Sequence, residues 1–354
     1  MARVSSKGGK PASGVLLSSS VLGACILSLA ASAQLSAQGC AESPSSVLVV
    51  NVKDKGAKGD GRTNDTVPIQ AAIDAIAGTG GTVFVPNGTY MVDAVDHRLT
   101  LKSDMALKLS EGATLKAIPN NSKHYSVLFI ADASNVTVVG GTLQGDRDEH
   151  KGKSGEWGMG IRIGHGAKHI IISGVTAREM WGDGFYVQGA TDVRFCSVTA
   201  DNNRRQGLSI IEADGLVVTN SVFKNTHGTR PSAGIDLEPN TPEQKITNVR
   251  IENSKFLHNA GGGIQIAGKK GRISNVAITS NVFRSGRPIL VENAPAVLSS
   301  AICGNRHIAY QSEPSGGLNA FGKPVEVVAL QRDCQEGRDP RFEVNRQKKR
   351  NRRK

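Results

Sequence analysis

The sequence contains few aromatic residues and few cysteines, and it lacks a hydrophobic run suited to a confident membrane span. Phe, Trp and Tyr make up 4% of its 354 residues, whereas 41 residues are glycine. This composition is typical of an all-β protein with many turns. No spacing of Cys or His resembles a zinc site. We therefore expect neither a metal centre nor a transmembrane span in the mature chain.

The few cysteines are distributed as expected for an exported protein. Removal of an N-terminal signal would leave Cys40, Cys196, Cys303 and Cys334, an even number in an oxidising compartment. Cys303 and Cys334 could close a C-terminal loop. Cys196 falls within a strand pattern, and we expect it to be a buried free thiol.

Residues 1–33 have the pattern of a secretory signal peptide. A basic start precedes an apolar run over residues 15–30 that serines interrupt, and Ala-Ser-Ala at 31–33 suits cleavage. The sequence Leu-Gly-Ala-Cys ending at Cys25 also resembles a lipoprotein cleavage box, but the apolar residues after it favour this less. The pattern predicts a secreted or periplasmic protein, with a lipid anchor at Cys25 as the weaker alternative.

The net charge of +12 lies mostly at the two ends of the chain. Residues 341–354 carry eight Lys and Arg against Glu343, and Arg3, Lys7 and Lys10 add to the N-terminus. Such a tail is typically a solvated, disordered segment, although it could contact anionic surfaces through charge alone. No aromatic residues interleave with these charges, so specific nucleic-acid binding is not indicated.

A repeat organises the middle of the chain. The segments "GIRIGH", "GFYVQG", "GLSIIE", "GIDLEP", "GIQIAG" and "PILVEN" start at residues 160, 184, 207, 234, 263 and 288, and most are followed by a second short apolar run. One repeat of this size cannot bury its own apolar face, but stacked repeats share a continuous core. Hairpin turn signals are rare. The sequence therefore predicts an all-β, single-stranded parallel β-helix.

Two further patterns support this fold. Phe223, Phe256 and Phe283 share one repeat position and should stack inside, while Asn220 and Asn253 should form a side-chain ladder at a turn. Before the repeats, "TNDTVPIQAAIDAIAG" predicts an amphipathic helix over about residues 66–77 with Asp65 as its N-cap. We expect this helix to cover the open end of the core.

We predict three regions: the signal peptide at 1–33, the β-helix with its cap at 45–310, and a C-terminal segment with the disordered basic tail at 311–354.

The N-terminal part resembles a known superfamily. "VKDKGAKGDGRTNDTVPIQAAIDAI", "GGTVFVPNGTY" and "LKSDMALKLSEGATLKA" are similar to the N-terminal signature of the pectin lyase-like right-handed β-helices, which include polygalacturonases, rhamnogalacturonases and epimerase-like pectate lyase domain proteins. The resemblance implies a right-handed helix and a polysaccharide substrate. It leaves the reaction open, because one fold carries several chemistries.

The polygalacturonase motifs do not carry over to this sequence. "GHG" precedes "WGDG", no Asp-Asp pair begins the next coil, and no Arg-Ile-Lys follows. The Asp-Pro-His signature of alginate epimerases is also missing. Site residues must therefore be derived from the repeat itself.

Alignment of the repeats on their first glycine predicts which side chains point outward. The residue after that glycine and the one two later face the core, so the residues between them face solvent. This places a polar groove on one face, with substrate contacts expected from Arg162, Tyr186, Gln188, Arg204, Arg205 and Gln206, and with Trp157 and Trp181 at its edge. The charged insertion at residues 145–157 should form a loop beside this groove.

Three carboxylates, Asp183, Asp236 and Glu238, are the candidate catalytic groups. Strand geometry puts Asp236 and Glu238 roughly 6.6 Å apart and Asp183 roughly 9.6 Å from Asp236. A glycosidase needs one carboxyl as acid and another as base or nucleophile, about 5 to 9.5 Å apart. Alternatively, Asp236 and Arg205 form a structural ion pair.

Three functions remain open from the sequence. The first is a monomeric secreted hydrolase that cuts an acidic polysaccharide without a cofactor. The second is a lyase or C5-epimerase in which Arg204, Arg205 and Tyr186 act, with Ca²⁺ as an accompanying ion. The third is a glycan-binding or adhesin-like β-helix without activity.

Overall fold

The computed structural model describes residue 40 and residues 47–268, 270–284, 286–292, 301–310 and 324–325. The chain divides into two units, residues 1–42 and 43–354, and the β-helix belongs to the second. The signal peptide, the lipoprotein box and the basic tail lie outside the described residues, as do Cys25 and Cys334.

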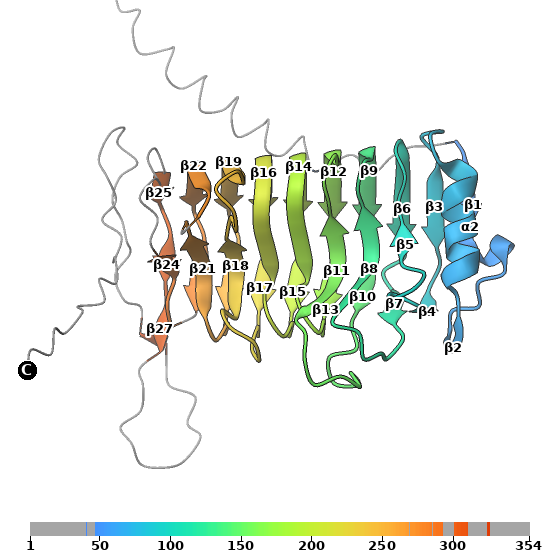
Figure 1. The fold of residues 1–354 in the computed structure, drawn as a ribbon, viewed down its shortest axis with the longest axis horizontal. Coiled ribbons are helices and arrows are strands. Elements are labelled where there is room, and N and C mark those ends of the chain that lie inside the picture. Colours follow the sequence, from blue (N-terminus) through green and yellow to red (C-terminus); the bar gives the residue numbers. More distant parts are fainter. Residues whose placement is uncertain are drawn as a thin grey trace, which may run out of the picture. The chain divides into compact units, whose positions relative to one another are not determined.

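The strands form a parallel β-helix, as predicted, and they stand side by side along the stack in Figure 1. One wall of the helix, called the site face here, consists of strands paired in parallel. These strands are β5 (Leu99–Thr100), β8 (His124–Ile130), β11 (Trp157–Ile163), β14 (Phe185–Cys196), β16 (Leu208–Thr219), β18 (Ala233–Leu237), β21 (Gly262–Ala267) and β24 (Ile289–Glu292).

Two further walls complete each coil. The second wall includes the later halves of β14 and β16 with β1 (Val49–Asn51), β3 (Thr82–Val85), β6 (Met105–Leu109), β9 (Ser134–Val139), β12 (Lys168–Ser173), β19 (Lys245–Glu252), β22 (Arg272–Thr279) and β25 (Ala301–Cys303). The third wall is the sheet of β2 (Asp60–Asn64), β4 (Gly88–Val92), β7 (Ala113–Ala117), β10 (Thr142–Gln144), β13 (Thr176–Arg178), β15 (Thr199–Asp201), β17 (Val222–Lys224), β20 (Lys255–Leu257), β23 (Val282–Arg284) and β26 (Arg306–His307). A short antiparallel pair, β27 (Ala309–Tyr310) and β28 (Pro324–Val325), follows.

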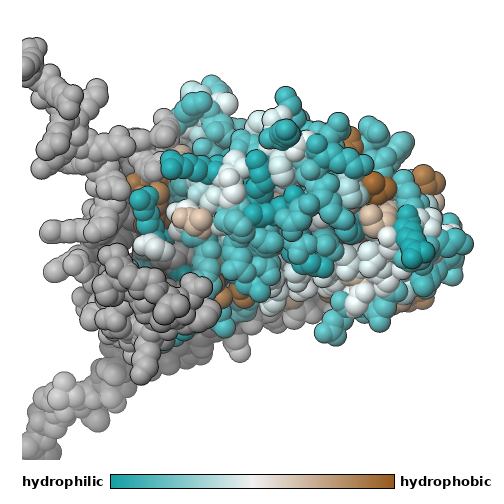
Figure 2. Space-filling model, turned by 90° about the horizontal axis from the view of Figure 1, so that it is seen from below, coloured by the Kyte–Doolittle hydropathy of each residue, from teal (hydrophilic) through white to brown (hydrophobic). Residues whose placement is uncertain are grey.

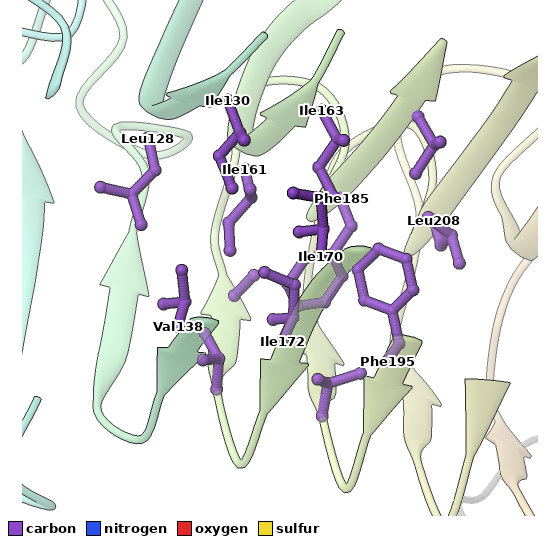
Figure 3. Packing of buried hydrophobic residues seen from close by; sticks show 14 of the residues in the cluster. Leu128, Ile130, Val138, Ile161, Ile163, Ile170, Ile172, Phe185, Phe195 and Leu208 are labelled. Atoms are coloured by element: carbon purple, nitrogen blue, oxygen red, sulfur yellow. The ribbon is translucent and has the colours of Figure 1, made fainter. Parts of the chain in front are cut away.

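The predicted register of the site face is confirmed. Its outward column pairs Arg162 with Tyr186, Tyr186 with Ser209, Ser209 with Asp236 and Asp236 with Gln265. The flanking Ile, Leu, Phe and Val residues of these strands are buried. Figure 3 shows hydrophobic side chains from the walls meeting in the interior. Strand alternation thus fixes which side chains reach the groove.

Stacked side chains run through the core. The rings of Phe223 and Phe256 lie 5.3 Å apart and those of Phe256 and Phe283 lie 4.9 Å apart, both nearly parallel, which confirms the predicted aromatic stack. The hydrogen-bonded ladder at the adjoining turn is displaced by one residue from the prediction. Asn220 and Asn253 adopt positive φ angles, and so do Ser280 and Gly304 at the same place in later coils. The ladder is built by the residue after each of these: Ser221, Ser254, Asn281 and Asn305.

The predicted cap helix is present as α2 (Thr66–Ile76) and lies against β1 and β3 at one end of the stack (Figure 1). Ile69, Ile73 and Ile76 of α2 are fully buried and form the apolar side of the helix. Asp65 is the N-cap residue, but its carboxylate accepts from the backbone N–H groups of Lys58 and Gly59 at 2.6 and 3.0 Å instead of capping α2. The preceding turn η1 (Val52–Lys55) is a 3₁₀ helix. The hydrogen bonds of Asp65 therefore hold the loop around Lys58 and Gly59 against the start of α2.

One cysteine prediction is wrong. Cys196 is buried at the end of β14, but it is disulfide-bonded and not a free thiol. Cys303 is also disulfide-bonded. A strand pattern shows burial but does not show which sulfur atoms come together, so the sequence could not exclude this bond.

The surface in Figure 2 is mostly hydrophilic, with hydrophobic residues scattered over it. Within the described residues, no helix is both long and apolar enough to cross a membrane.

Candidate functional site

A group of four carboxylates gathers around one arginine on the site face. Arg205 lies between β15 and β16, and its Nη1 donates to Asp183 Oδ2 at 3.1 Å while Nη2 donates to Glu238 Oε2 at 3.4 Å. Its Nε lies 3.8 Å from Glu156 Oε2. We call Arg205, Asp183, Glu156, Asp236 and Glu238 the Arg205 cluster.

Charge within the cluster is unbalanced. Burial by itself lowers the pKa of Arg205, but the four carboxylates outweigh it and raise the pKa above its ordinary value. Arg205 therefore stays charged. One guanidinium cannot neutralise four ionised carboxylates, and a crowded set of acids favours retention of a proton on one of them.

Asp183 is the carboxyl of the cluster whose pKa is raised most clearly. Its side chain is fully buried, and the Ser209 hydroxyl donates to its Oδ2 at 2.9 Å. Burial raises the pKa of Asp183 to about 6, although Arg205 and Ser209 lower it and Glu156 raises it further. Its second oxygen, Oδ1, is buried and has no hydrogen-bond partner among the described residues. A protonated oxygen fits this position better than a charged one.

Asp236 is also fully buried, although it belongs to the outward column. Gln206 Nε2 donates to its Oδ2 at 2.8 Å, and Gln206 Oε1 accepts from the backbone N–H of Ala233 at 2.9 Å. This pair of bonds fixes which way the Gln206 amide faces. Asp236 is thus held below the groove surface, two residues before Glu238 in the chain.

Glu156 and Glu238 are the members of the cluster that reach solvent, and each side chain is 32% exposed. Sequence reasoning identified Glu238 but missed Glu156. Glu156 comes from the charged insertion, which does lie beside the groove as predicted. The repeat columns gave no signal for it because it lies outside the repeat.

Arg162 and Tyr186 border a pocket of about 220 Å³ next to the cluster. Tyr186 donates its hydroxyl to Gln188 at 3.2 Å, and burial raises the pKa of Tyr186. Gln188 pairs with Glu212, because a bulge shifts the register there, and not with Ile211 as the repeat alignment predicted. Trp157, 37% exposed, lines the same pocket and stacks on His124 at 4.6 Å.

The other two predicted groove residues hold the inserted loop. Arg204 lies over the ring of Trp181 at 3.9 Å and donates to the backbone oxygen of Gly155 at 2.9 Å. The opposite side of Trp181 stacks on His150 at 4.0 Å. Sugar contact by Arg204 and Trp181 stays a prediction that this packing does not favour.

A second, larger hollow lies on the other side of the cluster. It encloses about 730 Å³ and is lined by Glu238 and Gln265 together with Arg230, Arg287 and neighbouring residues. The Arg205 cluster thus lies between two openings on one wall. Among the residues described, no group of three or more His, Cys, Asp or Glu is arranged to hold a metal ion.

Residues 49–287 match the family described as rhamnogalacturonase A/epimerase, pectate lyase-like. The chain belongs to this family. The expected superfamily resemblance is therefore confirmed, and with it the right-handed β-helix.

Among curated relatives, the mannuronan C5-epimerase AlgE4 of Azotobacter vinelandii is 38% identical over 194 residues, which cover 49% of this chain and 33% of that protein. The uncharacterized protein YclG of Bacillus subtilis is 28% identical over 254 residues, 61% of this chain and 43% of that one. Plasmin and fibronectin-binding protein A of Streptococcus pneumoniae is 29% identical over 232 residues, 58% and 31% respectively. The chain spans less than half the length of these relatives.

Solved structures show the same fold. The AlgE4 A-module of Azotobacter vinelandii gives a TM-score of 0.52 at 24% identity, with 73% of this chain and 88% of that chain covered. The surface adhesin PfbA of Streptococcus pneumoniae gives 0.56 at 18%, covering 75% and 82%. The family 28 exopolygalacturonase of Yersinia enterocolitica gives 0.54 at 16%, covering 76% and 67%. At these identities the likeness concerns the fold alone.

Proposed function

We infer that this family member is an exported hydrolase of an acidic, uronate-containing polysaccharide, and that the Arg205 cluster is its active site. The observation that carries the proposal is the arrangement of four carboxylates around one guanidinium: Asp183 and Asp236 are buried, and Glu156 and Glu238 are partly exposed where substrate can reach them. Acid–base chemistry uses titratable groups whose environments separate their pKa values.

Glu238 and Glu156 are the carboxylates that meet substrate. They lie against different nitrogens of the same guanidinium. Their carboxyl oxygens are therefore separated by no more than roughly 9.5 Å, the upper limit for the carboxyl pairs of glycosidases. In this mechanism Glu238 takes a proton from water as the water attacks the anomeric carbon. Glu156, which must carry a proton when substrate binds, gives it to the leaving oxygen as the glycosidic C–O bond breaks. The proton that Glu238 has taken from water returns to Glu156 through solvent before the next turnover.

Asp183 acts through Arg205. It holds the guanidinium between the two glutamates, and its pKa of about 6 keeps a proton on it in mildly acidic solution, which limits the negative charge of the cluster there. Asp236, fixed by Gln206, supports the strand end that presents Glu238. Both residues were expected from the sequence to be catalytic; their complete burial favours positioning roles.

The test is substitution of the exposed pair. Glu238→Gln and Glu156→Gln should each lower kcat on a uronate polymer about 10² to 10⁴-fold, the range for loss of a general acid or base. Glu149→Gln, which alters an exposed glutamate of the same loop paired with Lys116, should leave kcat unchanged. Full activity in both active-site variants would refute the assignment.

Epimerisation is the second candidate, favoured by the 38% identity with mannuronan C5-epimerases over half of the chain. Such a reaction needs a base that removes the proton at C5 of the uronate. Tyr186 suits this role poorly because its raised pKa keeps it protonated. Arg205 is already engaged by carboxylates and is less available to a uronate. Incorporation of solvent deuterium at C5 without chain cleavage would establish epimerisation instead.

A further inference from the structure

Two arginines face the 220 Å³ pocket without a carboxylate partner. Arg98, just before β5, and Arg162, on β11, both line it. Within the described part of the chain, neither guanidinium takes part in an ion pair, although Arg178, Arg194, Arg205 and Arg250 all do. Two guanidinium groups without an ion-pair partner in one hollow provide a binding site for an anion.

The two guanidiniums are close enough to sense each other. Burial lowers the pKa of Arg98, and the charge of Arg162 lowers it further. The protein holds both cations on aromatic rings: Arg98 lies 3.8 Å from the ring centroid of Phe129, and Arg162 lies between Phe129 and Tyr186 at 5.9 and 5.7 Å. Rings fix the direction of a guanidinium and leave its N–H donors free for a ligand.

A buried donor points to the same conclusion. Arg162 Nε is buried at the edge of the pocket that Arg162 lines, and it has no hydrogen-bond partner among the described residues. An unsatisfied donor of this kind costs free energy unless a ligand or water accepts from it. A carboxylate can accept from two guanidinium N–H groups at once.

The size and lining of the pocket suit one sugar ring. Its volume lies below the roughly 300 to 1,000 Å³ of pockets for drug-sized ligands. Trp157 and Tyr186 add flat aromatic surface, on which the apolar face of a sugar can pack. Arg162 lies two strands from Ser209 of the active site, or roughly 9.6 Å at the usual strand spacing. A short oligosaccharide spans that distance.

We propose that the Arg98–Arg162 pocket is a binding subsite for one uronate unit of the polysaccharide, with the sugar carboxylate held between the two guanidiniums. This rests on the proposed function, because it supplies the substrate contact that sets the chain in register with Glu156 and Glu238.

The experiment measures binding without cleavage. Calorimetric titration of a Glu238→Gln background with hexamers of galacturonate or mannuronate should give affinity that falls at least tenfold with Arg98→Gln and with Arg162→Gln, as expected for loss of a charged hydrogen bond. The matched control is Arg250→Gln on the second wall, a half-exposed arginine paired with Glu252, which should bind as the background does. Hexamers of neutral galactose should bind weakly and equally to all four proteins.

Several outcomes would overturn the subsite: unchanged uronate affinity in both pocket variants, binding of neither uronate hexamer, equal affinity for the neutral hexamer, or displacement of the hexamer by an equal concentration of inorganic sulfate. The result is independent of hydrolysis. If binding depends on Arg98 and Arg162 but the wild-type protein never cleaves the polymer, the subsite is supported and the proposed hydrolase is contradicted. Cleavage with arginine-independent binding would do the reverse.

Discussion

At the scale of single residues, Asp183 is a fully buried carboxyl whose pKa is raised by its burial. Its pKa lies near 6 in the folded protein and near 3.8 in an unfolded chain. As pH rises from 4 to 6, the unfolded chain releases this proton while the folded chain still holds it. Deprotonation thus favours unfolding, and the contribution of Asp183 to stability is present below about pH 4 and lost as pH rises through 6.

We therefore predict that part of the pH dependence of stability disappears in Asp183→Asn. In the wild type this group should lower the free energy of unfolding by roughly 2 kcal/mol between pH 4 and pH 6. Urea denaturation of both proteins at half-unit pH steps measures the two slopes. Identical slopes would show that Asp183 does not titrate in this range.

The sequence could predict several site residues and not others. Asp183, Arg205 and Glu238 were foreseen because the repeat period fixes which side chains share a wall. Glu156 was not, because the path of an inserted loop depends on tertiary contacts and not on the period. The burial of Asp236 was also missed, since strand alternation gives the direction of a side chain but not what covers it.

At the scale of elements, the loop at residues 145–157 depends on one buried carboxylate. Asp146 accepts hydrogen bonds from the Tyr125 hydroxyl at 2.6 Å, from His150 Nδ1 at 2.8 Å and from the backbone N–H of Asn120 at 3.0 Å. These bonds anchor the start of the segment that carries Glu156 to the Arg205 cluster.

Asp146→Ala should loosen this loop. The substitution leaves the buried Tyr125 hydroxyl without its acceptor, at a cost of about 1 to 3 kcal/mol, and it should raise the hydrogen-exchange rate of residues 147–156. Hydrogen exchange measured by mass spectrometry reports both the loss of stability and the faster exchange of the loop. Glu149→Gln, which breaks only a surface ion pair, should change stability by less than about 1 kcal/mol. An equally protected loop in Asp146→Ala would contradict the anchor.

The phenylalanine stack is the second element open to test. Phe256 is fully buried between Phe223 and Phe283. Phe256→Ala should cost about 3 to 5 kcal/mol, whereas Val67→Ala on the exposed side of α2 should cost less than about 0.5 kcal/mol. Denaturant titrations compare the two. A small effect at Phe256 would mean that neighbouring coils close the cavity.

Elements were predictable where the repeat is regular. The register of the site face, the phenylalanine stack and the cap helix all followed from sequence periodicity. The errors occurred where local geometry departs from the repeat: the bulge at Gln188 shifts its partner by one residue, and the polar ladder begins one residue after the asparagines. A one-residue shift cannot be read from a pattern of period two.

At the scale of the whole molecule, we expect the basic residues 341–354 to act independently of the Arg205 cluster. Deletion of residues 341–354 should leave kcat on a soluble oligosaccharide unchanged. It should reduce retention on an anionic resin at low salt, with the difference vanishing near 1 M salt because the Debye length falls to about 3 Å. Chromatography of both proteins over a salt gradient measures this, and equal retention would exclude an electrostatic role for the tail.

The central claim is hydrolysis of an acidic polysaccharide at the Arg205 cluster. The most direct measurement is incubation of the mature protein with uronate polysaccharides in ¹⁸O-labelled water, followed by mass spectrometry of the products. The account predicts products that carry one heavy oxygen at each new reducing end, with their formation abolished in Glu238→Gln. Unsaturated products without the label would show elimination, and intact polymer would show that the groove binds glycan without cutting it; either result would contradict the account.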